Sequence, residues 1–220
     1  MIRFLKNEWM FFDIHTHSQK QEKEVFSIIS LSFPEIRHFN PSFHYSLGLH
    51  PWKVQEETLS ENLSFIEENA QLDCVKAIGE TGLDKMSDVP FDLQKKAFVA
   101  QIQISEKANK PVIIHCVKAF DELIALKKEL KPKQTWIIHG FRGKPQQMEQ
   151  LIQQDFYLSF GNQWNKESVR LIPKDQFFLE TDQAHVSIQE IYRKVAEETG
   201  LREKDLLIRI EENFRTCFEK

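Results

Sequence analysis

The sequence has few cysteines, no long apolar run and no large excess of charge of either sign. Three cysteines without C-x-x-C spacing argue against the disulfide framework of a small secreted protein and favour a reducing compartment. No apolar run approaches transmembrane length, and Lys6, Asn7 and Glu8 interrupt the apolar start where a secretory signal needs an unbroken core. We therefore expect a cytoplasmic protein that does not associate with membranes.

The balance of charges also limits the kinds of partner. A formal net charge of -4 provides no general basic surface for nucleic acid, so contact with a polyanion would depend on a local basic patch or on bound cations. Internal repeats, low-complexity tracts and long Ser/Gly linkers are absent from the sequence. We expect one domain over residues 1–220 and no obligate protein partner.

Short apolar runs alternate with longer amphipathic stretches along the chain. The runs are apolar almost throughout, as expected of strands buried on both faces of a parallel sheet covered by helices. We predict eight strands, at residues 10–14, 25–30, 45–49, 74–79, 111–115, 135–139, 156–160 and 177–181. Helices are predicted at residues 57–70, 91–110, 118–130, 145–153, 166–171, 187–199 and 203–218. This alternation predicts an α/β fold, a (β/α)8 barrel of the TIM type.

The first part of the predicted barrel departs from the ideal pattern. Seven residues, Ser18–Glu24, separate the first two strands, whereas a parallel crossover with a helix needs about a dozen. The next connection, residues 33–44, has little helical signal. We expect the first one or two helices to be reduced to loops.

The first predicted strand ends in an H-x-H motif formed by His15 and His17. Residues two apart in an extended chain share a face, so both imidazoles can reach one metal ion. Potential ligands end four further strands: Glu80, His115, His139 and Asp182. In a parallel barrel these strand ends face one mouth, where active sites of the fold are built. We expect the six side chains to form one metal site, because an unpaired cluster of this kind is costly to desolvate.

The ordered motifs DIHTH, GLHP, GETGLD, PVIIHC, IIHGF and LETD resemble those of the TatD-like metal-dependent deoxyribonucleases, in the amidohydrolase-like barrel superfamily. The resemblance covers residues 11–182 and implies two divalent metal ions. One ion would be bound by His15, His17 and Asp182, and Glu80 would bridge it to the second. The second would be completed by two later histidines, His115 and His139. Val117 departs from the resemblance, because relatives commonly carry an arginine there.

The ligand set implies a hydrolase in which a metal-activated water cleaves a phosphodiester bond. Asp182 is the candidate to orient this water and take its proton, and Glu80 is the second catalytic candidate because it would hold both ions together. Imidazole and carboxylate ligands suit Zn, Mn, Ni or Co, and Mg remains an alternative. The sequence does not select the metal.

Candidate substrate contacts follow the ligand strands. Arg142 and Lys144 suit phosphate, while His50 suits either a phosphate contact or a structural turn before Pro51. A site recessed in a barrel mouth favours DNA with single-stranded ends. The alternative function is a metal-dependent amidohydrolase or lactonase acting on a small molecule, although such relatives often carry a carboxylated lysine where Glu80 stands. A non-catalytic binding module is the third hypothesis.

Four other residues lie near the predicted mouth of the barrel. Trp52, Phe141 and Trp164 follow predicted strands, where they could stack on bases, but loop packing is the favoured interpretation for each. Asp84 is expected to fix the loop that carries Glu80.

Overall fold

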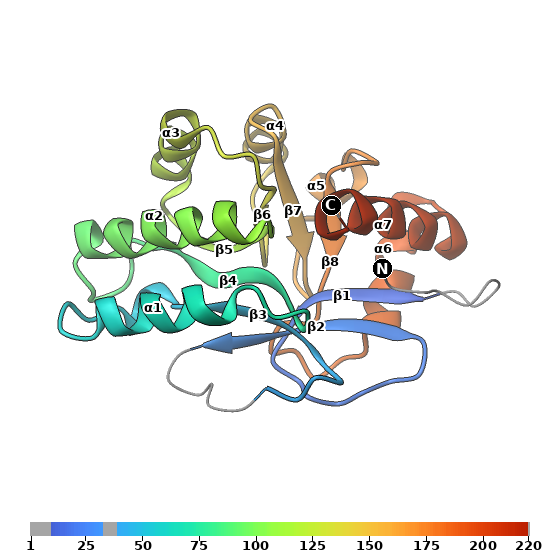
Figure 1. Cartoon of the computed structure of the whole chain (residues 1–220). Coiled ribbons are helices and arrows are strands. Elements are labelled where there is room, and N and C mark those ends of the chain that lie inside the picture. Colours follow the sequence, from blue (N-terminus) through green and yellow to red (C-terminus); the bar gives the residue numbers. More distant parts are fainter. Residues whose placement is uncertain (1–9, 33–38, 220) are drawn as a thin grey trace.

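The structure is a computed structural model that describes residues 10–32 and 39–219. Eight strands pair in sequence order, and every neighbouring pair is parallel (Figure 1). The strands are β1 (Phe11–Thr16), β2 (Val25–Ser32), β3 (His44–Gly48), β4 (Val75–Asp84), β5 (Val112–Val117), β6 (Trp136–Ile138), β7 (Phe156–Phe160) and β8 (Phe177–Leu179). A parallel bridge between Thr16 and Asp182 joins the two ends of the sheet, which confirms the predicted TIM-type barrel.

Helices cover the outside of the barrel from β3 onward. They are η1 (Pro51–Lys53), α1 (Leu59–Asn69), α2 (Phe91–Ala108), α3 (Phe120–Leu130), α4 (Pro145–Ile152), α5 (Lys166–Arg170), α6 (Ile188–Thr199) and α7 (Glu203–Phe218). Each coincides closely with an amphipathic stretch predicted from the sequence, apart from the short η1. No helix in the described part of the chain is long and apolar enough to cross a membrane.

The first crossover contains no helix. Residues 17–24 connect β1 to β2 as loop and turn, as predicted. The described part of the next connection, residues 39–43, is also without a helix, and residues 33–38 lie outside the described part. The first wall of the barrel therefore has no crossover helix of its own over the described residues.

The C-terminal helices cover β1 instead. The Tyr192 hydroxyl of α6 accepts a hydrogen bond from the amide of Phe12 at 3.1 Å and donates to the carbonyl oxygen of Phe12 at 3.2 Å. Phe214 of α7 packs against Phe12 and Phe26, with ring centroids 4.6 and 4.8 Å away. These four side chains are buried. Apolar burial thus ties the start of the barrel to its last two helices.

Candidate metal centre

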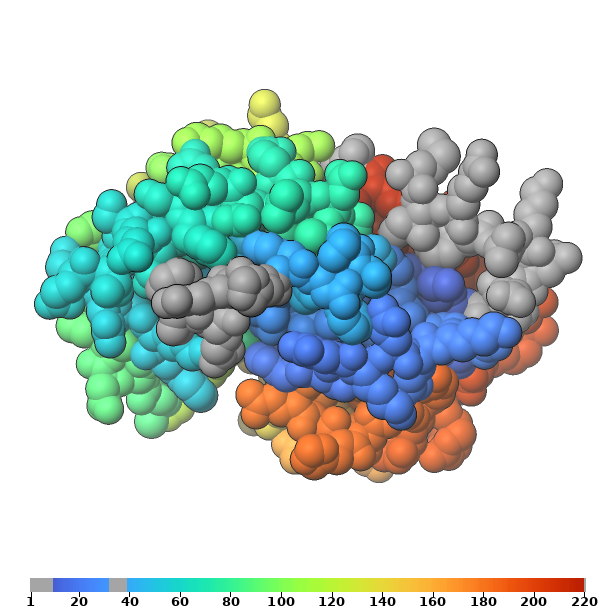
Figure 2. All heavy atoms as spheres, turned by 60° about the horizontal axis from the view of Figure 1, so that its bottom comes forward, coloured from blue at the N-terminus to red at the C-terminus, as the bar shows by residue number. Residues whose placement is uncertain are grey.

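The structure brings all six predicted metal ligands together at the carboxyl ends of the strands. His15 lies in β1, Glu80 in β4 and His115 in β5, while His17, His139 and Asp182 lie just beyond strand ends. In Figure 2 the orange part of the chain, which follows β8, lies beside the blue part that contains the first strands.

Four of these residues have the spacing of ligands around an ion. The Nε2 atom of His15 lies 3.5 Å from Glu80 Oε2 and 3.6 Å from Asp182 Oδ1. The Nε2 atom of His17 lies 3.9 and 3.5 Å from the same two oxygens. These separations are long for hydrogen bonds. They are close to the ~3.4 Å between ligands that each lie about 2.1 Å from a tetrahedral metal ion.

The burial of His15 also fits a role as a metal ligand. Its side chain is fully buried, and neither ring nitrogen has a hydrogen-bond partner. Buried polar atoms are nearly always paired, so a ring left in this state fits an ion that accepts its lone pair. The residues present therefore fit a divalent metal ion.

The other carboxylate oxygen of Glu80 faces three imidazoles. Oε1 lies 2.8 Å from His139 Nε2, 3.1 Å from His50 Nε2 and 3.2 Å from His115 Nδ1. The two oxygens of Glu80 are therefore directed at two different histidine groups.

Both candidate catalytic carboxyls are held in the ionised form. Burial raises the pKa of Glu80, but the charge of His139 and hydrogen bonds with the histidines outweigh it, and the pKa falls well below its usual value. For Asp182, burial also raises the pKa, and His15 and His17 more than compensate by lowering it. Anionic oxygens are therefore available as ligands at neutral pH.

His50 has the structural role expected in the turn before Pro51, and its phosphate contact stays a prediction. Its Nδ1 accepts a hydrogen bond from the amide of Trp52 at 3.2 Å, which caps η1. A neutral imidazole has one donor and one acceptor nitrogen, so the proton then lies on Nε2, facing Glu80. Burial lowers the pKa of His50, which favours this neutral form. In this state His50 donates to Glu80 rather than binding an ion.

Two supporting carboxylates have roles that the sequence did not predict. Glu180 is fully buried, and its Oε1 lies 3.3 Å from His139 Nδ1 and accepts from the amide of Gly140 at 2.8 Å. Asp84 belongs to β4 itself, and its Oδ2 lies 3.1 Å from His115 Nε2. The expectation that Asp84 fixes a loop carrying Glu80 is thus wrong. Each carboxylate holds the far nitrogen of a candidate histidine ligand, the usual support for such ligands.

A third buried carboxylate, Asp13, contacts Thr181, the residue that precedes Asp182. Asp13 accepts hydrogen bonds from the amide of Thr181 at 3.0 Å and from its hydroxyl at 2.6 Å. Burial raises the pKa of Asp13 to about 7. Asp182 itself has a φ of 52°, in the left-handed region that few non-glycine residues adopt. The contact with Asp13 helps to hold this segment in place.

Glycine allows β4 and β5 to approach closely between Glu80 and His115. Gly82 has a φ of 151°, and a Cβ there would lie 1.9 Å from the carbonyl oxygen of His115. The register of the pair also shifts between Ile78 and Thr81. No larger residue fits this position without moving the strand that carries His115.

Two of the three predicted substrate contacts, His50 and Arg142, line a cavity at the cluster, and Lys144 does not. A cavity of about 720 Å³ lies over the cluster and is lined by Glu80, His50 and Arg142 among others. Arg142 is exposed there and donates to the side-chain oxygen of Gln163 at 2.9 Å. Lys144 is exposed but is not among the lining residues, because the chain turns at Gly143 to begin α4.

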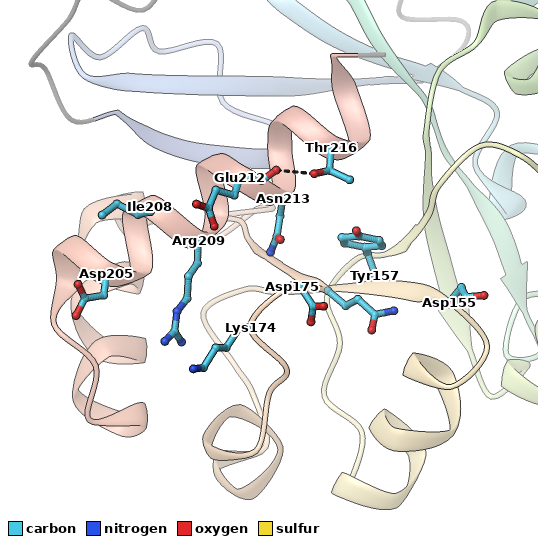
Figure 3. A pocket seen from close by; sticks show the side chains of 11 residues that line it. Asp155, Tyr157, Lys174, Asp175, Asp205, Ile208, Arg209, Glu212, Asn213 and Thr216 are labelled. Atoms are coloured by element: carbon cyan, nitrogen blue, oxygen red, sulfur yellow. Dashed lines mark hydrogen bonds between the residues drawn. The ribbon is translucent and has the colours of Figure 1, made fainter.

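Two further cavities are present in the described part of the chain. One, of about 640 Å³, reaches the cluster from the side of the first crossover and shares His17 and Asp182 with the cavity above. The other, of about 910 Å³, lies at the opposite end of the strands, beside α7 (Figure 3). It is lined by residues of both charges, including Asp175, Lys174 and Arg209, and by none of the predicted ligands.

A parallel barrel with histidines and carboxylates converging at the carboxyl ends of its strands is an architecture of metal-dependent enzymes. Residues 27–219 match the family model described as TatD related DNase. The chain therefore belongs to this family, as the sequence motifs indicated.

Individual relatives agree with this assignment. The chain is 35% identical over 146 residues to the "Uncharacterized metal-dependent hydrolase YabD" of Bacillus subtilis, covering 62% of this chain and 57% of the relative. It is 29% identical over 170 residues to the "3'-5' ssDNA/RNA exonuclease TatD" of Escherichia fergusonii, covering 72% and 64%. The chain thus spans less than two thirds of the length of these relatives.

The fold of a solved structure is also similar. The crystal structure of YJJV, a TatD homolog from Escherichia coli K12, superposes with a TM-score of 0.80 at 21% identity and covers 96% of this chain and 98% of the other. The similarity extends over nearly all of both chains. The two proteins therefore share the barrel fold.

Proposed function

We propose that this protein is a divalent-metal-dependent phosphodiesterase, a deoxyribonuclease that acts on single-stranded DNA. The position of Glu80 carries this proposal, because its two oxygens face separate histidine groups. Membership of this family supports the same reaction, as do the names of the metal-dependent hydrolase and exonuclease relatives.

The proposed site holds two ions. His15, His17 and Asp182 would bind one, His115 and His139 would bind the other, and Glu80 would contribute an oxygen to each. The donor set suits Zn, Mn, Ni or Co, with Mg as a further candidate. When bound, such ions lower the pKa of water and neutralise charge on a phosphodiester.

The protein's own groups would complete the chemistry. The Asp182 side chain is about one third exposed and lines both cavities at the cluster, so it is placed to orient the attacking water and to accept its proton. Glu180 and Asp84 would keep His139 and His115 in fixed orientations. His50 donates toward Glu80 and so would help to hold this carboxylate in position.

The substrate assignment rests on the surroundings of the site. Arg142 lines the cavity and can contact the phosphate backbone, and Lys144 lies close by in sequence. We propose single-stranded ends as the preferred DNA, in agreement with the relative named as a single-strand exonuclease. The small-molecule alternative is less well supported, because Glu80 stands where a carboxylated lysine is expected. A single domain, a cytoplasmic location and the lack of an obligate partner stay predictions.

A metal and substrate panel tests this function. The purified protein is analysed for bound metal and assayed with each candidate ion on single-stranded DNA, RNA, bis-p-nitrophenyl phosphate and simple amides. We expect up to two ions per chain and hydrolysis of the phosphodiesters, with His15→Ala as the inactive control. Amide hydrolysis without phosphodiester hydrolysis would instead favour the amidohydrolase.

A further inference from the structure

Trp52 is a large apolar side chain that stays 62% exposed beside the metal centre. It belongs to η1, which directly follows the loop after β3, and it lines the 720 Å³ cavity together with Glu80 and His115. An isolated exposed apolar residue is common on protein surfaces and needs no explanation. Trp52 differs because its position is fixed at a cavity wall.

Hydrogen bonds fix both the backbone and the ring of Trp52. Its indole Nε1 donates to Asp84 Oδ2 at 2.6 Å, and its amide donates to His50 Nδ1 at 3.2 Å. The ring also meets His50 and His115 at steep angles, with centroids 4.8 and 5.6 Å away. The Nε1 proton lies in the plane of the indole. This hydrogen bond therefore holds one edge of the ring and leaves its faces for other contacts.

The same cavity combines apolar and cationic walls. Val117 and Phe120 line it, as do the side chains of Lys53, Lys118 and Arg142. Proteins that bind single strands place aromatic rings for the bases beside cations for the backbone. The lining therefore suits a nucleotide better than an uncharged apolar ligand.

The other two aromatic residues that follow predicted strands do not combine exposure with a place in the cavity wall. Phe141 is only 2% exposed and packs against Phe160 and Phe120. Trp164 is partly buried against the core and is not among the residues that line the cavity. The packing interpretation thus holds for Phe141 and Trp164, whereas Trp52 is open to the cavity.

We propose that Trp52 is the stacking platform of a nucleobase subsite. It would hold the base of the nucleotide next to the phosphodiester at the metal centre. The chain of contacts from Trp52 through Asp84 to His115 sets the position of this base relative to the cluster. The identity of the ligand rests on the proposed function.

A binding experiment without metal tests the subsite directly. Two labelled single strands of equal length and phosphate number are compared in the presence of a chelator, one with normal bases and one with abasic sites. The wild type should prefer the strand with bases by at least about five-fold, the low end of measured stacking effects. Trp52→Leu should lose this preference, and Trp52→Phe should keep part of it because it retains an aromatic face.

A matched control and an activity measurement complete the test. Trp164→Leu removes a tryptophan outside the cavity and should keep the wild-type preference. With metal, Trp52→Leu should lower hydrolysis of thymidine 5′-p-nitrophenyl phosphate more than that of bis-p-nitrophenyl phosphate, which has no base. A role limited to supporting His115 through Asp84 would lower both equally.

The outcomes separate the subsite from the proposed function. A wild type without a base-dependent preference, or a preference that survives in folded Trp52→Leu, would overturn the subsite. If neither phosphodiester is hydrolysed with any metal, the proposed function fails, and the chelated binding comparison still decides the subsite.

Discussion

Asp13 is joined to Thr181 by two hydrogen bonds, one from the Thr181 amide at 3.0 Å and one from its hydroxyl at 2.6 Å. The contact connects β1 to the residue that precedes Asp182, at the seam where the barrel closes. Asp13 contributes to this seam through its side chain, whereas His15 and His17 contribute through backbone hydrogen bonds with Asp182.

We expect Asp13→Ala to lower both stability and metal affinity. Removing the carboxylate leaves the buried Thr181 amide without its acceptor, a loss of about 1–3 kcal/mol in the free energy of unfolding. Asp13→Asn is the matched control, since its amide keeps one acceptor and should lose less. Denaturant unfolding and metal titration measure both effects. Unchanged metal affinity in a folded Asp13→Ala protein would refute the link to Asp182.

Asp182→Asn should separate catalysis from binding. Asparagine has the same shape and tolerates the left-handed φ of 52°, so the backbone should persist. Loss of the proton acceptor should reduce hydrolysis by about 10²-fold or more. Binding of single-stranded DNA should survive, because phosphate contacts do not need proton transfer. Hydrolysis of a 3′-labelled strand and a parallel binding assay check this. Wild-type turnover would remove Asp182 from the mechanism.

His115→Ala should behave as a metal-binding defect. The imidazole lies 3.2 Å from Glu80 Oε1, on the side of the proposed second ion. Losing one ligand lowers affinity first, so a high metal concentration should restore part of the activity. The measurement is activity as a function of metal concentration. A loss that no concentration of any candidate metal relieves would contradict a ligand role.

His44 should make stability depend on pH. Burial, with a smaller effect of Lys76, lowers the pKa of His44 to about 4, and its ring stacks on Phe26 at 4.3 Å. Between pH 4 and about 6.5 the unfolded chain binds the extra proton. Stability contributed by neutral His44 is therefore present above pH 6.5 and is lost as the pH falls toward 4.

His44→Gln is the variant for this measurement. The half-buried position reduces the effect to an estimated ~1 kcal/mol. The difference in unfolding free energy between wild type and variant should change across pH 4 to 6.5 and stay constant above it. A constant difference over the whole range would show that His44 titrates normally in the folded protein.

Sequence periodicity was enough to predict the barrel, because strands buried on both faces are apolar throughout and the helices between them are amphipathic. The same pattern predicted that Glu80, His115 and Asp182 lie at one end of the barrel, because the carboxyl ends of parallel strands face the same way. The partners of the histidines could not be predicted in the same way. Glu180 and Asp84 are ordinary acidic residues in the sequence, and their roles depend on side-chain direction across different strands.

The positions of Trp52 and Lys144 relative to the cavity could not be predicted from the sequence either. Both follow predicted strands and are exposed, yet the cavity takes in Trp52 and leaves out Lys144. That difference arises from local turns, η1 in one case and the start of α4 in the other. Turn geometry depends on a few backbone angles, which composition and spacing do not determine.

Because α6 and α7 cover β1, the first strand can complete its packing only late in synthesis. Phe12 cannot gain its contacts with Tyr192 and Phe214 until those distant residues have left the ribosome. His15 and Asp182, which join the two ends of the sheet, come together at the same late stage. Contacts so distant in sequence slow folding. The capacity to bind metal should therefore arise only after the segment that carries Asp182 has been synthesised and has joined β1.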